Sequence, residues 1–164
     1  MLKPIKTKTT RAVSGTFAIV ASKYNSRYVD AMLRAAQSEL KRAGAKIHVV
    51  RVPGAYEIPV VAAKLARAAQ LSTINYQLSA IICLGMILRG ETTHAAHIGE
   101  AVSNALMQIQ ITHEIPVIHE VLLLENEAQA RVRCLGKKHN RGTEAAQTAL
   151  EMARVMKSLP PKSF

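Results

Sequence analysis

Apolar residues along the chain alternate between short continuous runs and stretches with helical spacing. The runs at 16–22, 46–52, 79–88 and 116–123 predict four strands. Apolar residues that recur every three or four positions predict five helices, at about 26–43, 60–69, 94–112, 127–135 and 143–157. The charge-free third run is typical of a central strand covered on both faces. The order of elements therefore predicts an α/β fold, a three-layer sandwich with a four-stranded parallel sheet and helices on both faces.

Glycine, proline and small polar residues mark where several of these elements end. Asn25 or Ser26 can cap the first helix at its start, and Gly44 can end it in a left-handed conformation. Pro53-Gly54 predicts a turn after the second strand, and Pro59 suits the first turn of the helix that follows. These signals support the element order that the periodicity predicts.

The length of 164 residues, 49% of them hydrophobic, is typical of one globular domain. No linker or internal repeat divides the chain, so we expect a single domain over residues 1–164, with residues 1–14 as a mobile or exchanged N-terminal arm. The two cysteines, Cys83 and Cys134, form no C-x-x-C pair, which favours a reducing cytoplasm over a disulfide framework. The apolar run at 78–88 is too short to span a membrane.

The charge balance is strongly basic, with 22 lysines and arginines against 11 acidic residues and a net charge of +11. Such a balance suggests an anionic partner without naming one. Aromatic residues make up only 4% of the chain, which argues against a protein that stacks the bases of single-stranded nucleic acid. A nucleic-acid-binding protein is therefore supported by charge alone, and we expect neither nucleic acid nor membrane as a partner.

The stretch from Leu84 to His94 carries the most informative chemistry. A buried strand ends there, a glycine-bearing loop follows and a helix begins, which is where ligands bind in open α/β sheets. Gly90 lets the backbone approach a ligand closely, and the amides of Glu91 and Thr92 can donate to a phosphate. An ordinary helix cap with solvated threonines explains this segment, taken alone, equally well.

His94 falls in the first turn of the predicted helix, at the positive end of the helix macrodipole. This position keeps its imidazole available as a base near neutral pH, which suits proton transfer. His97 follows three residues later, but the H-E-x-x-H pattern is absent and no acidic residue lies between the two histidines. We therefore expect no metal site.

Two further segments follow strands at the same predicted edge of the sheet. Gly54 to Glu57 offers an exposed backbone, the ring of Tyr56 and a carboxylate, although Glu57 can equally serve the dipole of the next helix. Tyr24 follows the first strand and can supply an aromatic wall. Arg133, on the helix after the fourth strand, can clamp a phosphate because a guanidinium presents paired donors.

Four motifs together resemble the 6,7-dimethyl-8-ribityllumazine synthase family. Their order and spacing, within a resemblance from Phe17 to Met156, make the match highly specific. The motifs are Val52-Pro53-Gly54-Ala55-Tyr56-Glu57-Ile58-Pro59, Leu84-Gly85 through Arg89-Gly90-Glu91-Thr92-Thr93-His94, Ile115-Pro116-Val117-Ile118 and Asn140-Arg141-Gly142.

The resemblance implies a flavodoxin-like fold and the penultimate reaction of riboflavin biosynthesis. That reaction condenses 5-amino-6-(D-ribitylamino)uracil with 3,4-dihydroxy-2-butanone 4-phosphate and needs no metal or organic cofactor. By the resemblance, His94 is the general acid/base, and the amides of Glu91 and Thr92 bind phosphate. The residues implied to contact the pyrimidine substrate are Tyr24, Ala55, Tyr56, Glu57, Met86, Ile87 and Leu88.

The resemblance also implies assembly, because His119 and Arg133 match positions that a neighbouring subunit contributes. His119 would contact the pyrimidine substrate and Arg133 the phosphate. The sites would then lie between subunits of a homopentamer, and the sequence leaves open whether pentamers stay single, pair into a decamer or close into an icosahedral 60-mer. Riboflavin synthase is a further candidate partner.

Several positions depart from the pattern of the family. Ala95-Ala96-His97 replaces an aromatic-acid-aromatic run and so removes a carboxylate beside His94. His119 stands where the family usually has Phe, Glu120 replaces a usual Gly, and Arg141 replaces a usual Lys while keeping its charge. These departures leave open an alternative, a weakly active homologue that binds flavin- or lumazine-type ligands or forms a shell.

Overall fold

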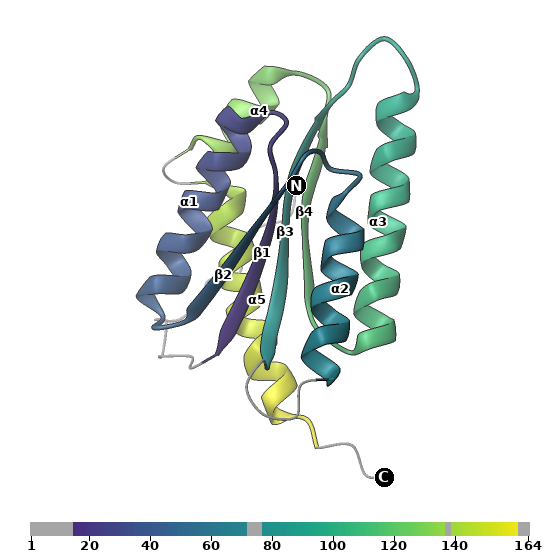
Figure 1. The fold of residues 1–164 in the computed structure, drawn as a ribbon. Coiled ribbons are helices and arrows are strands. Elements are labelled where there is room, and N and C mark those ends of the chain that lie inside the picture. Colours follow the sequence, from purple (N-terminus) through teal and green to yellow (C-terminus); the bar gives the residue numbers. More distant parts are fainter. Residues whose placement is uncertain (1–14, 72–76, 137–138, 161–164) are drawn as a thin grey trace.

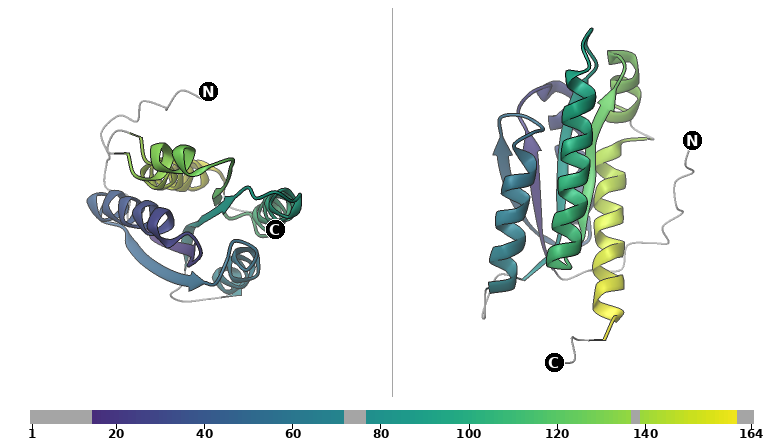
Figure 2. Two further views of the ribbon diagram at one scale, coloured as in Figure 1. Left: turned by 90° about the horizontal axis from the view of Figure 1, so that it is seen from above. Right: turned by 90° about the vertical axis from the view of Figure 1, so that its right-hand side faces the viewer.

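A computed structural model describes residues 15–71, 77–136 and 139–160. Residues 1–14, predicted above as an N-terminal arm, lie outside this range. The described residues form four strands and five helices, and the helices cover both faces of one sheet (Figures 1 and 2). The predicted fold class, a three-layer α/β sandwich of flavodoxin-like arrangement, is confirmed.

All four strands run parallel in the order β2-β1-β3-β4. Their bounds are Thr16–Ser22 for β1, Lys46–Val52 for β2, Leu78–Leu88 for β3 and Val117–Leu124 for β4. β3 lies between β1 and β4, as its charge-free run predicts, and β4 is an edge strand. Because the strands are parallel, their carboxyl ends meet at one edge of the sheet.

Helices α1, α4 and α5 cover one face of the sheet, and α2 and α3 cover the other (Figure 2). Their bounds are Ser26–Arg42 for α1, Ile58–Leu71 for α2, His94–His113 for α3, Glu127–Cys134 for α4 and Arg141–Ser158 for α5. α2 and α5 each begin two residues before the predicted start. Pro59 lies in the first turn of α2, as predicted, since a proline there loses no helical hydrogen bond.

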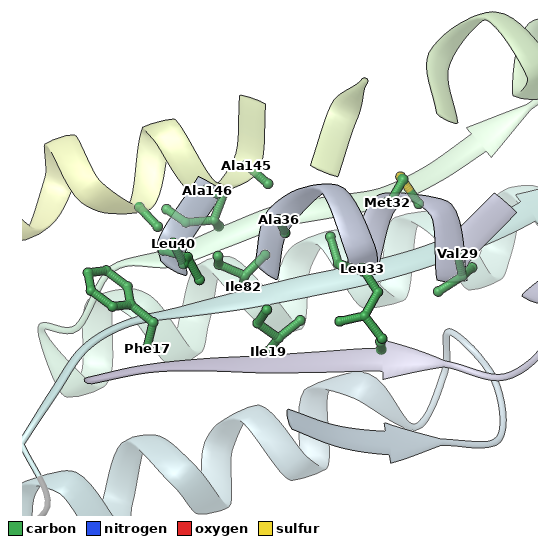
Figure 3. Close-up of a cluster of buried hydrophobic side chains, with 14 of the residues drawn as sticks. Phe17, Ile19, Val29, Met32, Leu33, Ala36, Leu40, Ile82, Ala145 and Ala146 are labelled. Atoms are coloured by element: carbon green, nitrogen blue, oxygen red, sulfur yellow. The ribbon is translucent and has the colours of Figure 1, made fainter. Parts of the chain in front are cut away.

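The face of the sheet under α1 and α5 carries the larger of two apolar clusters (Figure 3). On α1, Val29, Met32, Ala36 and Leu40 are fully buried, at the spacing of three and four residues that predicted the helix. Full burial of a side chain as large as that of Val29, Met32 or Leu40 contributes about 1.5–3 kcal/mol. The amphipathic pattern of α1 therefore determines which side of the helix meets the sheet.

The two ends of α1 differ in how well the sequence predicted them. Gly44 has a φ of 74°, and its N–H donates to the carbonyl of Lys41 at 3.0 Å, so the left-handed helix end is confirmed. Asn25 occupies the N-cap position, as one of the two predicted candidates, but its side chain makes no capping hydrogen bond. Its Nδ2 instead donates to the carbonyl of Met86 at the end of β3, at 3.0 Å.

The Asn140-Arg141-Gly142 motif brings α5 against α1. Asn140 caps α5, because its Oδ1 accepts from the N–H of Gly142 at 2.9 Å while its Nδ2 donates to the carbonyl of Cys134 at 2.5 Å. A Cβ atom on Gly142 would overlap the backbone carbonyl of Met32 on α1. The close packing of these two helices therefore requires glycine at this position.

Both cysteines are free and buried, Cys83 in β3 and Cys134 at the end of α4. Burial raises the pKa of both thiols, that of Cys134 to about 11. Among the described helices, none has the length and apolar character that crossing a membrane requires.

Replacing Gly142 by Ala should lower the free energy of unfolding by about 1–3 kcal/mol, because the new methyl group forces α5 away from α1. Urea denaturation at one fixed protein concentration measures this loss. The matched control is Gly90→Ala, since a Cβ atom at Gly90 meets no atom within 4 Å. Equal stability of the two variants would contradict the close-packing argument.

Candidate functional site

A cleft of about 700 Å³ opens at the carboxyl edge of the sheet, a size typical of small-molecule sites. Its walls come from the turns after β1 and β2, the end of β3 and the first turns of α3. The lining residues are Tyr24, Asn25, Gly54, Ala55, Tyr56, Glu57, Met86, Ile87, Leu88, His94, His97, Ile98 and Ala101. The cleft thus brings together Tyr24, Ala55, Tyr56, Glu57, Met86, Ile87, Leu88 and His94 from the predicted site residues.

Hydrogen bonds that continue beyond the strand ends hold these walls in register. The N–H of Lys23 donates to the carbonyl of Val52 at 2.8 Å, and the N–H of Tyr24 donates to that of Pro53 at 3.0 Å. Asn25 extends the connection to β3 through its bond to the carbonyl of Met86. The turns after β1 and β2 are therefore fixed relative to each other and to the end of β3.

Two tyrosine rings stand at the cleft with most of their surface exposed. Tyr24 is 70% exposed and Tyr56 is 63% exposed, so each has a ring face available for a planar ligand. A Cβ atom on Gly54 would lie 3.0 Å from Cδ2 of Tyr24, which shows that the ring packs closely over this glycine. The Pro53-Gly54 turn thus supports the aromatic wall.

Glu57 contributes the carboxylate of the cleft. Its Oε2 accepts from the N–H of Gly54 at 2.8 Å, so the side chain stabilises its own turn. Glu57 precedes α2, and the first turn of that helix contains no acidic residue. Within the described residues, no hydrogen-bond partner is found for its Oε1. The turn therefore orients Glu57 and leaves an acceptor for a hydroxyl or a ring N–H group.

The loop before α3 begins at a fixed point. The N–H of Arg89 donates to the carbonyl of Leu124 at 2.8 Å, and Nη1 of Arg89 forms an ion pair with Oε1 of Glu125 at 2.9 Å. Both contacts join the loop to the end of β4. These contacts therefore fix the first residue of the loop against the end of β4.

The same loop leaves backbone donors exposed beside His94, the first residue of α3. Oγ1 of Thr92 accepts from the N–H of His94 at 3.4 Å, while Thr93 at the N-cap position makes no side-chain capping bond. Among the described residues, no partner is found for the N–H groups of Glu91 and Thr92, which lie next to the cleft lining without belonging to it. Such free donors at a helix start favour binding of an anion.

Two predicted site residues lie away from this cleft. His119 is exposed on the edge strand β4, and Arg133 is exposed on α4. Arg133 has no carboxylate partner among the residues that the structure describes. Within a single chain, His119 and Arg133 therefore lie apart from His94 and its cleft.

The cleft also has lining residues beyond the predicted set. His97, Ile98 and Ala101 follow His94 at the spacing of one helix face, a signal that could have identified them from the sequence. In the parts of the chain that are described, no group of three metal-ligating side chains exists, so His94 and His97 have no third ligand there.

A partly buried cluster of Arg141 and two glutamates connects β4 to α5. Arg141 donates from Nε to Oε2 of Glu120 at 2.9 Å and from Nη2 to Oε1 at 2.8 Å, and its Nη1 donates to Glu144 at 2.6 Å. Burial raises the pKa of Glu120 to about 7, and the neighbouring Arg141 opposes that rise. The charge of Arg141 is thus directed at two carboxylates.

The position of the cleft in the sheet indicates the class of protein. β1 and β3 are neighbours whose connections leave in opposite directions, and the cleft opens at their carboxyl ends, between the turn after β1 and the end of β3. This switch point is where flavodoxin-like α/β proteins bind small planar ligands. Fold and cleft together define an α/β protein with a small-molecule site at the strand switch point.

Comparison with known proteins gives the family. The family model of 6,7-dimethyl-8-ribityllumazine synthase matches residues 14–157. The 6,7-dimethyl-8-ribityllumazine synthase of Stenotrophomonas maltophilia (strain R551-3) is 39% identical over 150 residues, which cover 90% of this chain and 92% of the relative. The protein of the same name from Xanthomonas euvesicatoria pv. vesicatoria (strain 85-10) is 37% identical over 153 residues, which cover 92% and 95%. The chain belongs to the 6,7-dimethyl-8-ribityllumazine synthase family, as its motifs predict.

The raised pKa of Glu120 predicts a pH-dependent contribution to stability. The folded state binds a proton on Glu120 up to about pH 7, whereas the unfolded chain loses it near pH 4.5, so this contribution falls as the pH rises through that range. Urea unfolding of wild type and Glu120→Gln, followed from about pH 5 to about pH 8, should show the wild type losing more stability. The exposed Glu151→Gln variant is the control and should keep the wild-type slope. Parallel curves for wild type and Glu120→Gln would contradict the assignment.

Proposed function

We propose that this chain condenses 5-amino-6-(D-ribitylamino)uracil with 3,4-dihydroxy-2-butanone 4-phosphate to form 6,7-dimethyl-8-ribityllumazine, as a transferase of riboflavin biosynthesis. The observation that carries the proposal is the convergence of an aromatic wall, the Glu57 carboxylate and His94 in one cleft of a chain from this family. The products of the condensation besides the lumazine are inorganic phosphate and water.

The pyrimidine substrate binds in the part of the cleft formed by the turns after β1 and β2. The ring of Tyr24 stacks on the pyrimidine, because its face is exposed and its position is fixed over Gly54. Oε1 of Glu57 accepts from the ribityl hydroxyls, and the backbone of Ala55 and Tyr56 lines the same wall. Met86, Ile87 and Leu88 contact the edge of the ring.

The phosphorylated substrate binds at the start of α3. The N–H groups of Glu91 and Thr92 donate to phosphate oxygens, at the positive end of the helix dipole. Arg133 of a neighbouring copy supplies the second contact, since its guanidinium is exposed and has no carboxylate partner among the described residues. Arg141 cannot take this part while its donors are directed at Glu120 and Glu144.

The chemistry requires positioning and proton transfer more than a strong nucleophile. The amine of the pyrimidine substrate is itself nucleophilic and attacks the ketone of the second substrate. His94 moves protons during imine formation, phosphate elimination and ring closure. Holding both substrates side by side contributes several kcal/mol, up to roughly 7–11 for ideal alignment. The proposed reaction uses no metal or organic cofactor.

The proposed active unit is a homo-oligomer, because His119 and Arg133 lie outside the cleft of their own chain. We propose a homopentamer with sites between subunits, in which residues 1–164 of each copy form one synthase domain. Large apolar side chains exposed on the outer helices support such contacts, namely Val60 on α2 and Met107 and Ile111 on α3. Pairing into a decamer, closure into a 60-mer and association with riboflavin synthase are extensions of this arrangement. The proposed compartment is the cytoplasm, given two free cysteines.

Mixing both substrates should produce the fluorescence of a lumazine, and His94→Ala should lower kcat by roughly ten- to several-hundred-fold because proton transfer loses its carrier. His139→Ala, an exposed histidine outside the cleft, is the control and should match the wild type. Absence of product with the wild-type chain at high concentration would overturn the proposed function. A low rate that His94→Ala leaves unchanged would favour the weakly active, ligand-binding alternative.

Mixing two inactive variants tests whether the site lies between copies. His94→Ala and Arg133→Ala should each be impaired alone, yet co-refolding them at equal amounts should restore activity at about a quarter of the sites, where both neighbours contribute an intact residue. A sedimentation mass that is a multiple of five chains should accompany this recovery. No gain over the sum of the separate variants would contradict a shared site.

A further inference from the structure

A serine and a histidine make a direct contact at the edge of the sheet, outside the cleft. Ser103 of α3 lies opposite His119 of β4, and Oγ of Ser103 is 2.8 Å from Nε2 of His119. One helical turn earlier, Gly99 packs on Leu123 of the same strand, because a Cβ atom on Gly99 would lie 3.4 Å from Leu123. The side of α3 that faces the sheet therefore packs on β4 beside His119, the residue that we propose contributes to the site of a neighbouring copy.

The other hydrogen bonds of Ser103 and His119 show which atom is the donor in their contact. The hydroxyl of Ser103 donates to the carbonyl of Gly99 at 2.7 Å, so towards His119 it can only accept. The N–H of Val121 approaches Nδ1 of His119 as a donor in a long contact of 3.4 Å. Nε2 of His119 therefore carries the proton and donates it to Ser103.

The same directions exclude a nucleophilic serine. In a Ser–His catalytic pair, the hydroxyl donates to the imidazole, which then removes its proton. Here the hydroxyl proton is bound to the carbonyl of Gly99 and the imidazole is the donor. The contact thus holds the imidazole of His119 in place and does not activate Oγ of Ser103 as a nucleophile.

Partial burial lowers the pKa of His119, and a hydrogen bond with its own backbone opposes that change in part. A neutral ring is consistent with the bonds at both nitrogens, because protonation of Nδ1 would set it against the N–H of Val121. An uncharged imidazole presents a flat face that stacks on a heterocycle without the cost of removing a charge from water.

We propose that Ser103 is a positioning residue, which holds the imidazole of His119 in one orientation and one tautomer so that its face packs on the pyrimidine substrate bound by a neighbouring copy. This proposal rests on the proposed function. His119 is exposed on an edge strand, where an unrestrained side chain must be ordered when the ligand binds. Ser103 completes that ordering before the ligand arrives.

Removing the hydroxyl of Ser103 should weaken binding of the pyrimidine substrate and leave binding of the phosphorylated substrate unchanged. Ser103→Ala should raise the KM for 5-amino-6-(D-ribitylamino)uracil by about 2- to 10-fold, with the KM of the phosphorylated substrate and kcat unchanged. Ser103→Thr keeps the hydroxyl and should restore the wild-type KM. Ser38→Ala, a serine exposed on α1, is the matched control.

A double-mutant cycle separates positioning from a general effect on the fold. His119→Ala should raise the same KM, and adding Ser103→Ala to it should cause no further change, because Ser103 then has no ring to hold. An equal effect of Ser103→Ala with and without His119 would overturn the proposal, as would an unchanged KM. Nitrogen NMR of the histidine rings in the wild-type protein should find His119 protonated on Nε2, and a ring protonated on Nδ1 would also overturn it.

The positioning role of Ser103 can be tested separately from the proposed catalytic activity. If the wild-type chain makes no lumazine, fluorescence titration with 6,7-dimethyl-8-ribityllumazine replaces the kinetic measurement. A dissociation constant that rises about 2- to 10-fold in Ser103→Ala and returns in Ser103→Thr supports the positioning role without catalysis. A constant that Ser103→Ala leaves unchanged overturns it.

Discussion

Hydrogen bonding that continues past the ends of parallel strands is the constraint on which the cleft depends. Backbone amides after β1 pair with backbone carbonyls at the end of β2, and Asn25 connects the same turn to the last residues of β3. The left-handed backbone of Asn25, with a φ of 54°, turns the chain sharply from strand into helix while its side chain points across the sheet. Tyr24 and Glu57 owe their relative placement to these few bonds, because both residues lie on turns that no regular secondary structure holds.

Local pattern predicted most of the fold. The period of α1 and the charge-free run of β3 are strong signals. A helix buried on one side has periodic apolar residues, whereas a strand buried on both faces has a continuous apolar run. The predicted ends of the helices were less accurate, and the start of α5 illustrates the reason. Its start depends on the Asn140 cap and on the fit of Gly142 against the carbonyl of Met32, a residue far away in the sequence. Likewise Asn25 has the residue type of a helix cap, but its partner lies 61 positions later.

The candidate site was predictable where strand ends determine position, and not where partners are distant. Residues after β1, β2 and β3 converge because parallel strands end together, so Tyr24, Glu57 and His94 could be grouped from the sequence. Glu120 and Arg141 were recognisable only as two separate departures from the family pattern, and the structure shows that they are partners in one bidentate ion pair. Periodicity gives no information on such a pair, because 21 positions and a change of element separate the two side chains.

The burial of both thiols has a practical consequence. Cys83 and Cys134 are the only cysteines of the sequence, and neither is exposed. Thiolates are the reactive form, and burial disfavours that form at both positions. A cysteine introduced on the surface would therefore be the one fast-reacting thiol of the chain. Fluorophores or spin labels can be attached at chosen places on the natural background, without first removing native sulfur.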